Sequence, residues 1–189
     1  DYDEFSPETL APRSSAARDF RLLFVGNASR RKGADVVALL AERLDSGFEI
    51  RCTAGLRQQM KKGALANVRV LGRLTERELA EEYRSSDAVL VPSRYEGFGY
   101  SALEGMACAK PVVGFRCGAI EEVVHEGETA LLCDIDDIDA LEGNCRQLAS
   151  DAALRHAFGL AGRRRALECF SEASAVEAYL AVYALAAGA

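Results

Sequence analysis

The chain has 189 residues, of which 49% are hydrophobic and 28% are charged, and its formal net charge is −6. This length suits one globular domain with a sizeable core, and the acidic balance argues against a general nucleic-acid-binding protein. No apolar run is long enough to span a bilayer, and no signal peptide is visible at Asp1.

The chain contains six cysteines without a Cys-x-x-Cys pair, and only two histidines. Several of the cysteines fall within apolar runs, so we expect buried, reduced thiols in an intracellular protein rather than disulfides or metal ligands. Two histidines offer little for a zinc site.

Residues 1–20 are polar, hold two of the four prolines and show no helical or strand period. We interpret them as a linker that follows a domain outside this chain. The folded domain is then expected over residues 21–189.

Short apolar runs predict strands, and the segments between them predict helices. The expected strands are 21–26, 48–53, 68–71, 88–91, 111–115 and 130–133. The expected helices are 34–44, 56–65, 75–84, 101–108, 120–124, 137–149, 151–168 and 172–186. Because strands and helices alternate without a hairpin signal, we predict an α/β fold: a Rossmann-like, doubly wound parallel sheet of about six strands with helices on both faces and further helices at the C-terminal end.

The segment after the first strand carries Arg30, Arg31 and Lys32 at the start of a helix. Cations are unfavourable at a helix N-terminus. The basic run therefore either points into water or helps the helix end hold an anion, with a diphosphate as the best candidate. It is not a Walker A loop, because Lys32 precedes Gly33 and no Ser or Thr follows.

Residues 92–113 give the strongest functional signal. A loop with two glycines joins a buried strand to a short apolar helix, which is how α/β proteins present N–H groups to a phosphate. Glu96 lies at the mouth of the loop and Glu104 within the helix. A carboxylate on an apolar face needs donors, so Glu104 either reaches solvent or a neighbouring cap, or joins Glu96 in a ligand site at the strand's carboxyl end.

Residues 97–102 formally fit the dinucleotide fingerprint GxGxxG/A. They follow the fourth strand rather than the first, and no acidic residue closes the next strand, so we discount an NAD enzyme. Residues 117–122 form either a turn that opens a helix or a loop whose glycine lets backbone approach a ligand.

Three further patterns have mainly structural interpretations. The acidic run 134–139 predicts a solvated turn with a helix cap, with a divalent-ion site as the alternative. The three arginines at 163–165 predict a solvated helix face. Helical spacing places Tyr83, Tyr179 and Tyr183 in the core or at an interface.

Together, the basic loop and the stretch PSRYEGFGYSALEGMACAKPVVGFRCGAIEEVVHEGETALLC resemble the C-terminal, donor-binding domain of the retaining GT-B glycosyltransferases of family 4. The resemblance extends over almost the whole chain, and DYDEFSP is similar to the stretch after that family's interdomain linker. It implies a hexosyltransferase-type enzyme that uses a UDP- or GDP-linked sugar and needs no metal or other cofactor.

The resemblance also implies a role for individual residues. The lysine matching Lys32 binds the diphosphate, the glutamate matching Glu96 orients the donor sugar, and the one matching Glu104 holds the ribose hydroxyls. Cations and N–H groups would stabilise the departing diphosphate, and a carboxylate would suit an oxocarbenium-like sugar. The implied catalytic residues are Glu96 and Lys32, and the implied donor-binding residues are Gly26, Asn27, Arg31, Lys32, Gly72, Arg73, Leu74, Glu96, Phe98, Gly99, Tyr100 and Glu104.

The sequence departs from the family pattern at four positions. Asn27 replaces a usual Arg, Ala119 a usual Gly, Glu121 a usual Pro and Glu172 a frequent aromatic residue. We hypothesise that Arg30 or Arg31 supplies the positive charge that is missing at position 27. A binding-only nucleotide-sugar module is therefore the alternative to an active transferase.

The resemblance further implies that the acceptor-binding N-terminal domain lies outside this chain. We expect the chain alone to bind nucleotide sugar weakly and to transfer nothing. We expect the whole protein in the cytoplasm, with any contact to the inner face of the membrane made through that other domain.

Overall fold

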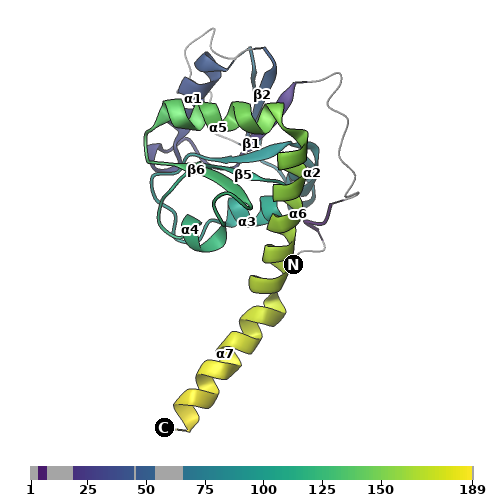
Figure 1. The fold of residues 1–189 in the computed structure, drawn as a ribbon, viewed down its shortest axis with the longest axis vertical. Helices are drawn as coiled ribbons and strands as arrows, with labels where there is room; N and C mark the ends of the chain where they lie inside the picture. Colours follow the sequence, from purple (N-terminus) through teal and green to yellow (C-terminus); the bar gives the residue numbers. More distant parts are fainter. Residues whose placement is uncertain (1–3, 8–18, 45, 54–65, 189) are drawn as a thin grey trace.

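The computed structural model describes residues 4–7, 19–44, 46–53 and 66–188 (Figure 1). Its six strands form one parallel sheet in the order β3-β2-β1-β4-β5-β6. The strands are β1 (Phe20–Phe24), β2 (Phe48–Thr53), β3 (Val68–Gly72), β4 (Ala88–Val91), β5 (Val112–Phe115) and β6 (Ala130–Cys133). The predicted doubly wound sheet is confirmed, and its strand order reverses between β1 and β4.

The helices agree with the prediction to within one or two residues at most ends. They are η1 (Arg30–Lys32), a 3-10 turn, then α1 (Ala34–Arg43), α2 (Glu76–Ser85), α3 (Tyr100–Ala107), α4 (Ile120–Val123), α5 (Ile138–Ser150), α6 (Ala152–Cys169) and α7 (Glu172–Ala187). The helix predicted over 56–65 lies outside the described residues.

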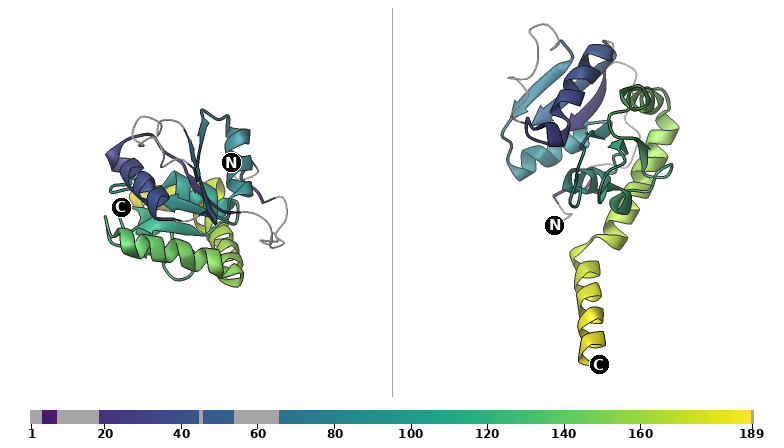
Figure 2. Two further views of the ribbon diagram at one scale, coloured as in Figure 1. Left: turned by 90° about the horizontal axis from the view of Figure 1, so that it is seen from above. Right: turned by 90° about the vertical axis from the view of Figure 1, so that its left-hand side faces the viewer.

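Helices cover both faces of the sheet (Figure 2). Successive strand side chains point to opposite faces, so Leu22 and Leu90 join one core with α1 and α5. Leu23 and Val89 join the other core, together with α2, α3, α4 and α6. Both cores need apolar residues, which explains why β4, β5 and β6 read as continuous apolar runs.

The first strand is shifted from its predicted bounds of 21–26. It begins at Phe20 and ends at Phe24. Beyond Phe24, the Thr53 hydroxyl replaces the backbone pairing of the sheet. It accepts a hydrogen bond from the N–H of Gly26 at 3.0 Å and donates one to the carbonyl of Gly26 at 3.1 Å. A side chain of the neighbouring strand thus satisfies the backbone where the ladder stops.

Thr75, Asp151 and Ser171 cap the helices α2, α6 and α7. Thr75 and Glu78 form a capping box, with the backbone N–H of Thr75 donating to Glu78 at 2.8 Å. The side chains of Asp151 and Ser171 cap α6 and α7. All six cysteines are free and all but Cys169 are buried, as expected.

The prediction of a solvated face at 163–165 is wrong for two of the three arginines. Arg163 donates to the carbonyl of Ala107, and Arg165 donates to the carbonyl of Val123 at 2.8 Å. Those carbonyls end α3 and α4, where helical carbonyls lack a partner within the helix. The two arginines therefore hold α6 against both helix ends.

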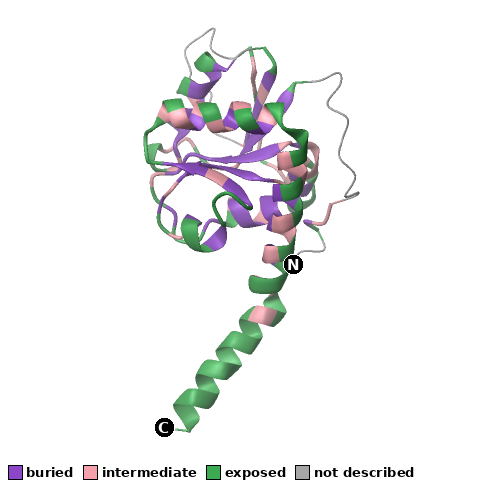
Figure 3. Ribbon diagram, in the orientation of Figure 1, coloured by how far each residue is buried: buried purple, intermediate pink, exposed green. Residues whose placement is uncertain are grey.

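Helix α7 projects away from the sheet and is exposed along its length (Figures 1 and 3). None of its residues is buried. Tyr83 is in the core as predicted, but Tyr179 and Tyr183 are not, with 66% and 64% of their surfaces exposed. In the described part of the chain, no helix is both long enough and apolar enough to cross a membrane.

Candidate functional site

Three loops meet at the carboxyl edge of the sheet, beside the reversal of strand order. They follow β1, β4 and β5, and cover residues 25–33, 92–99 and 116–119. Ligands of open α/β sheets bind in the crevice at such a reversal. The residues predicted for catalysis lie on the first two loops.

Glu96 is at the centre of these loops, and only 6% of its surface is exposed. Its carboxylate accepts a hydrogen bond from the hydroxyl of Ser93 at 2.8 Å and forms an ion pair with the ammonium of Lys32. The structure thus brings the two predicted catalytic residues into direct contact. A buried carboxylate requires such partners, since an unpaired buried charge is costly.

Close backbone contacts fix this arrangement at two glycines. Gly33 has φ +78°, and a Cβ there would lie 2.0 Å from the carbonyl oxygen of Pro92. Gly118 has φ +50°, and a Cβ there would lie 2.3 Å from the carbonyl oxygen of Glu96. That oxygen also accepts from the N–H of Ala119 at 3.1 Å. The 117–122 segment therefore opens α4 and also supports Glu96.

Arg94 joins three segments of the site. Its guanidinium donates to the carbonyl of Arg30 at 2.6 Å, to both carboxylate oxygens of Asp35 at 2.8 and 2.9 Å, and to Asp136 at 2.8 Å. Its backbone N–H donates to the carbonyl of Arg31 at 2.9 Å. The guanidinium holds the pKa of Asp35 below its usual value. In the acidic run, Asp136 therefore serves as an ion-pair partner, while Asp137 caps α5 as predicted.

The basic loop is ordered by its own polar groups. The side-chain oxygen of Asn27 accepts from the N–H of Ser29 at 3.1 Å, and Ser29 caps the η1 turn that contains Lys32. Arg31 reaches the second loop and donates to the carbonyl of Tyr95 at 3.1 Å, whereas Arg30 approaches Asp35. Of the two arginines considered for the charge missing at position 27, Arg31 is the one directed to the site.

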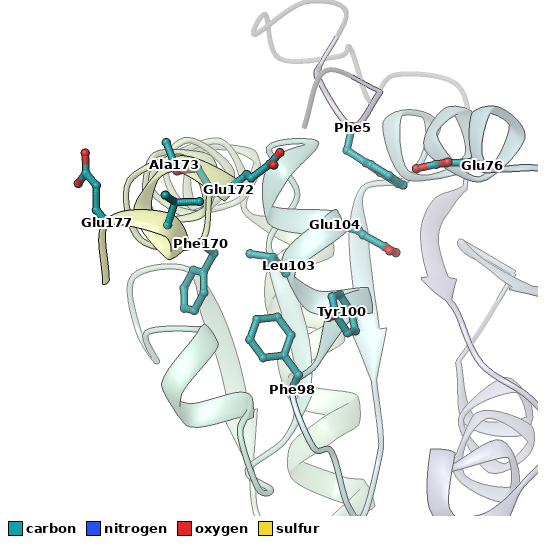
Figure 4. Close-up of a pocket in the computed structure, with 12 residues that line it drawn as sticks. Phe5, Glu76, Phe98, Tyr100, Leu103, Glu104, Phe170, Glu172, Ala173 and Glu177 are labelled. Carbon is teal, nitrogen blue, oxygen red and sulfur yellow. The ribbon is translucent and has the colours of Figure 1, made fainter. Parts of the chain in front are cut away.

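Glu104 lines a pocket that extends along α3 from the start of α2 to the corner where α6 meets α7, and its side chain points toward the α2 side (Figure 4). It accepts a hydrogen bond from the hydroxyl of Tyr83 at 2.8 Å. Burial raises the pKa of Glu104, and the Tyr83 hydroxyl opposes part of that rise. The carboxylate is thus held by a buried donor and lines a pocket.

The implied donor-binding residues divide between the two parts of the site. Phe98 and Tyr100 line the pocket with Glu104, and Gly99, at φ +95°, begins α3 beside them. Gly72, Arg73 and Leu74 do not line it. Gly72 ends β3, and Arg73 and Leu74 lie in the connection to α2, whose first residue does line the pocket.

Sequence reasoning missed several residues that support the site. Tyr83 and Arg94 hold Glu104 and the basic loop, and Ser93 holds Glu96. Phe5, which was assigned to a linker, lines the pocket. Only Ser93 and Arg94 carried a usable signal, because they immediately precede Glu96 within the distinctive stretch.

Comparison with known proteins assigns the family. The sequence pattern described as "Glycosyl transferases group 1" matches residues 7–165. The chain belongs to this family.

Curated relatives of this group 1 glycosyltransferase chain include enzymes that act on different substrates. It is 35% identical over 184 residues to D-inositol 3-phosphate glycosyltransferase from Pseudarthrobacter chlorophenolicus, covering 84% of this chain and 43% of the relative. It is 31% identical over 179 residues to alpha-maltose-1-phosphate synthase from Mycolicibacterium smegmatis, covering 85% and 46%. The chain thus spans less than half the length of these relatives.

Solved structures show the same fold. Sucrose-phosphate synthase from Thermosynechococcus elongatus superposes with a TM-score of 0.83 at 26% identity, covering all of this chain and 51% of that one. The C-terminal domain of a group 1 family protein from Francisella tularensis superposes with a TM-score of 0.73 at 21% identity, covering 91% and 98%. The group 1 chain therefore has the fold of a C-terminal glycosyltransferase domain.

Proposed function

We propose that this chain is the donor-binding half of a retaining, GT-B-type hexosyltransferase that uses a UDP- or GDP-linked sugar. The observation that carries the proposal is the buried Glu96, held by Lys32 and Ser93 where three loops meet, with Glu104 facing a pocket from the adjoining helix. The acceptor-binding domain would lie elsewhere in the protein.

The diphosphate would lie between Lys32 and the start of α3. The first N–H groups of a helix lack partners within it and carry a partial positive charge, so they suit an anion. The side chain of Lys32 is 21% exposed while paired with Glu96, and the proposal requires a ligand to reach its ammonium. Both groups are in place before charge develops on the leaving phosphate, and they would lower the barrier without a metal.

The two glutamates would act on the two sugars of the donor. Glu104, facing the pocket, would accept hydrogen bonds from the ribose hydroxyls. Glu96 would orient the transferred sugar and favour its developing positive charge. In this assignment, Lys32 contacts Glu96 and also neutralises the diphosphate, so it links orientation of the transferred sugar to diphosphate binding.

A binding-only nucleotide-sugar module is the alternative. It is favoured by Asn27, whose side chain is used in a turn and brings no cation to that position. Glycosyl transfer by the whole protein from a nucleotide sugar, measured against its Lys32→Ala variant, would separate the two functions.

The donor site can be tested by isothermal titration of the 189-residue chain with UDP, GDP and ADP in the absence of metal. We expect one nucleoside diphosphate to bind, and we expect Lys32→Ala and Glu104→Ala each to weaken it about tenfold or more, since hydrogen bonds to charged groups contribute about 1.5–3 kcal/mol. Arg164→Ala, which removes an exposed cation from α6, should leave binding unchanged. A folded chain that binds none of the three nucleotides would overturn the proposal.

Glu104 should also make nucleotide binding sensitive to pH. Because burial raises its pKa, Glu104 should protonate at a higher pH than an ordinary glutamate and then accept ribose hydroxyls less well. We expect affinity to fall as the pH decreases through this raised pKa, and we expect Glu104→Gln to bind more weakly at neutral pH and to lose that pH dependence. An identical pH profile for wild type and Glu104→Gln in the titration would contradict the assignment.

The buried carboxylate of Glu104 should also lower the stability of the chain at neutral pH. A raised folded-state pKa means that the native chain binds the proton more tightly than the unfolded chain. The free energy of unfolding therefore falls as the pH rises from the ordinary glutamate pKa through the raised one. Without ligand at neutral pH, Glu104→Gln should accordingly unfold at a higher temperature than wild type in calorimetry.

The missing domain would cover α7. This helix exposes apolar side chains around its circumference, and an exposed apolar surface of this kind marks an interaction site. Its large exposed side chains are Val176, Tyr179, Leu180, Val182, Tyr183 and Leu185. We place the whole enzyme in the cytoplasm, with membrane contact restricted to the other domain.

This assignment predicts how the isolated chain behaves in solution. With α7 uncovered, it should self-associate as its concentration rises, and Leu180→Lys with Tyr183→Lys should keep it monomeric in sedimentation equilibrium. Leu39→Lys on α1, where 38% of the leucine is exposed, is the control and should leave association unchanged. A wild-type chain that stays monomeric at every concentration would contradict the prediction.

A further inference from the structure

Residues 4–7 contact the domain although they precede its first strand. Phe5 is 6% exposed, while Glu4, Ser6 and Pro7 keep more of their surfaces in solvent. A side chain buried in this way belongs to the core, and Phe5 is part of the one that includes α2, α3 and α6. The predicted linker is thus anchored at one aromatic residue.

Two arginines hold the backbone around that residue. Arg84 of α2 donates to the carbonyl of Glu4 at 2.7 Å. Arg163 of α6 donates to the carbonyl of Phe5 at 3.4 Å and to the hydroxyl of Ser6 at 3.3 Å. Hydrogen bonds with a charged donor are stronger than neutral ones. The position of the segment is therefore specified by two separate helices.

The Phe5 ring packs against the residue that holds Glu104. It meets the Tyr83 ring edge-on, with centroids 5.9 Å apart and planes at 71°. The Tyr83 hydroxyl donates to Glu104 at 2.8 Å, and Tyr83 has no exposed surface. A continuous series of contacts leads from the segment through Phe5 and Tyr83 to the carboxylate.

Removing the Phe5 ring would break this series of contacts at the end farthest from Glu104. An edge-on aromatic pair contributes about 0.5–1.5 kcal/mol beyond the area it buries. Without that ring, Tyr83 would have space to rotate and its hydroxyl would no longer stay directed at Glu104. The carboxylate would then keep its place on α3 but lose its fixed orientation toward the pocket (Figure 4).

We propose that Phe5 is a positioning residue that couples the segment before the domain to ribose recognition, acting through Tyr83 on Glu104. The inference rests on the proposed function, in which Glu104 binds the ribose hydroxyls. Its consequence is that donor affinity depends on whether residues 4–7 are docked. A movement of the chain before this segment would then change the affinity for the ribose.

The test compares UDP with 2′,3′-dideoxy-UDP, or the GDP pair if the chain prefers GDP, by isothermal titration of the 189-residue chain. Wild type should prefer the ribonucleotide about tenfold, equivalent to about 1.4 kcal/mol. Phe5→Ala should abolish this preference by weakening the ribonucleotide alone, and Phe5→Leu should retain part of it. Equal weakening of both nucleotides, or an unchanged preference, would overturn the proposal.

A matched control comes from the opposite core. Phe20 also meets a second ring edge-on, that of Phe48, with centroids 5.6 Å apart. Phe20→Leu should lower the unfolding temperature without changing the ribose preference. An equal loss of preference in Phe20→Leu would show a general structural effect and would overturn the specific role of Phe5.

A second readout does not require any ligand. Burial and the nearby carboxylate of Glu76 raise the pKa of Glu104, and the hydrogen bond from the Tyr83 hydroxyl opposes that rise. Loss of this hydrogen bond in Phe5→Ala should therefore raise the pKa further in a carbon-13 NMR titration. An unchanged Glu104 titration would overturn the inference even if nucleotides bind. A raised Glu104 pKa in a chain that binds no nucleotide would uphold the contact series while refuting the proposed function.

Discussion

Replacement of Lys32 with alanine is expected to lower the free energy of unfolding by about 3 kcal/mol, because it leaves the buried charge of Glu96 without its counter-ion. Only 7% of the Glu96 side chain is exposed, and the Ser93 hydroxyl at 2.8 Å is the remaining side-chain donor among its described contacts. Glu96→Gln removes the charge and keeps the shape. The double variant Lys32→Ala/Glu96→Gln should therefore recover most of the stability that Lys32→Ala loses.

Binding should not recover in parallel. The double variant still lacks the cation proposed for the diphosphate, so its affinity for nucleoside diphosphate should remain as low as that of Lys32→Ala. Urea denaturation and isothermal titration of wild type, Lys32→Ala and the double variant measure both quantities. If Lys32→Ala is as stable as the double variant, the ion pair does not support Glu96 as described.

Replacement of Gly33 with alanine should be at least as damaging. The residue has φ +78°, and a new Cβ would lie 2.0 Å from the carbonyl oxygen of Pro92, so one of the two loops must move. The left-handed conformation alone costs a residue with a Cβ about 1–2 kcal/mol. With the displaced backbone added, we expect a loss of about 3 kcal/mol or more, within the range of other strained backbone sites.

Gly127 provides a matched control for this prediction. It has the same φ of +78°, but nothing lies within 4 Å of a Cβ built there. Gly127→Ala should therefore show only the conformational cost, about 1 kcal/mol. The difference between the two variants in chemical denaturation measures the contact between the loops, and equal losses would show that this contact is loose. Gly33→Ala should also weaken nucleotide binding, since the η1 turn before it contains Lys32.

The centre of the sheet could be predicted from sequence because strands such as β4 and β5 are covered on both faces. Runs such as 88–91 are apolar at every position, and a strand buried on both sides requires nothing else. The end of β1 could not be predicted in the same way. It depends on the hydroxyl of Thr53, which reaches Gly26 only after β1 and β2 are paired.

The site was predictable as a set of residues but not as a set of contacts. The pattern around Glu96 and Glu104 identified both glutamates, yet it left open whether Glu104 reached solvent or a ligand. The structure shows the Glu104 carboxylate held by the hydroxyl of Tyr83, which lies on another helix and could not be paired with it from sequence. Arg163 and Arg165 were misjudged for the same reason, because their acceptors are the ends of α3 and α4 and become neighbours only in the folded chain.

The hydrogen bonds of Arg94 affect both donor binding at the proposed site and its thermal unfolding. One guanidinium joins the carbonyl of Arg30, the carboxylate of Asp35 and that of Asp136, so the segments that contain them cannot loosen independently. Little conformational entropy then remains to be lost when a donor binds, which favours affinity. On heating, the three segments joined by Arg94 should lose their structure in one cooperative step, so that each molecule has either an intact site or an unfolded one.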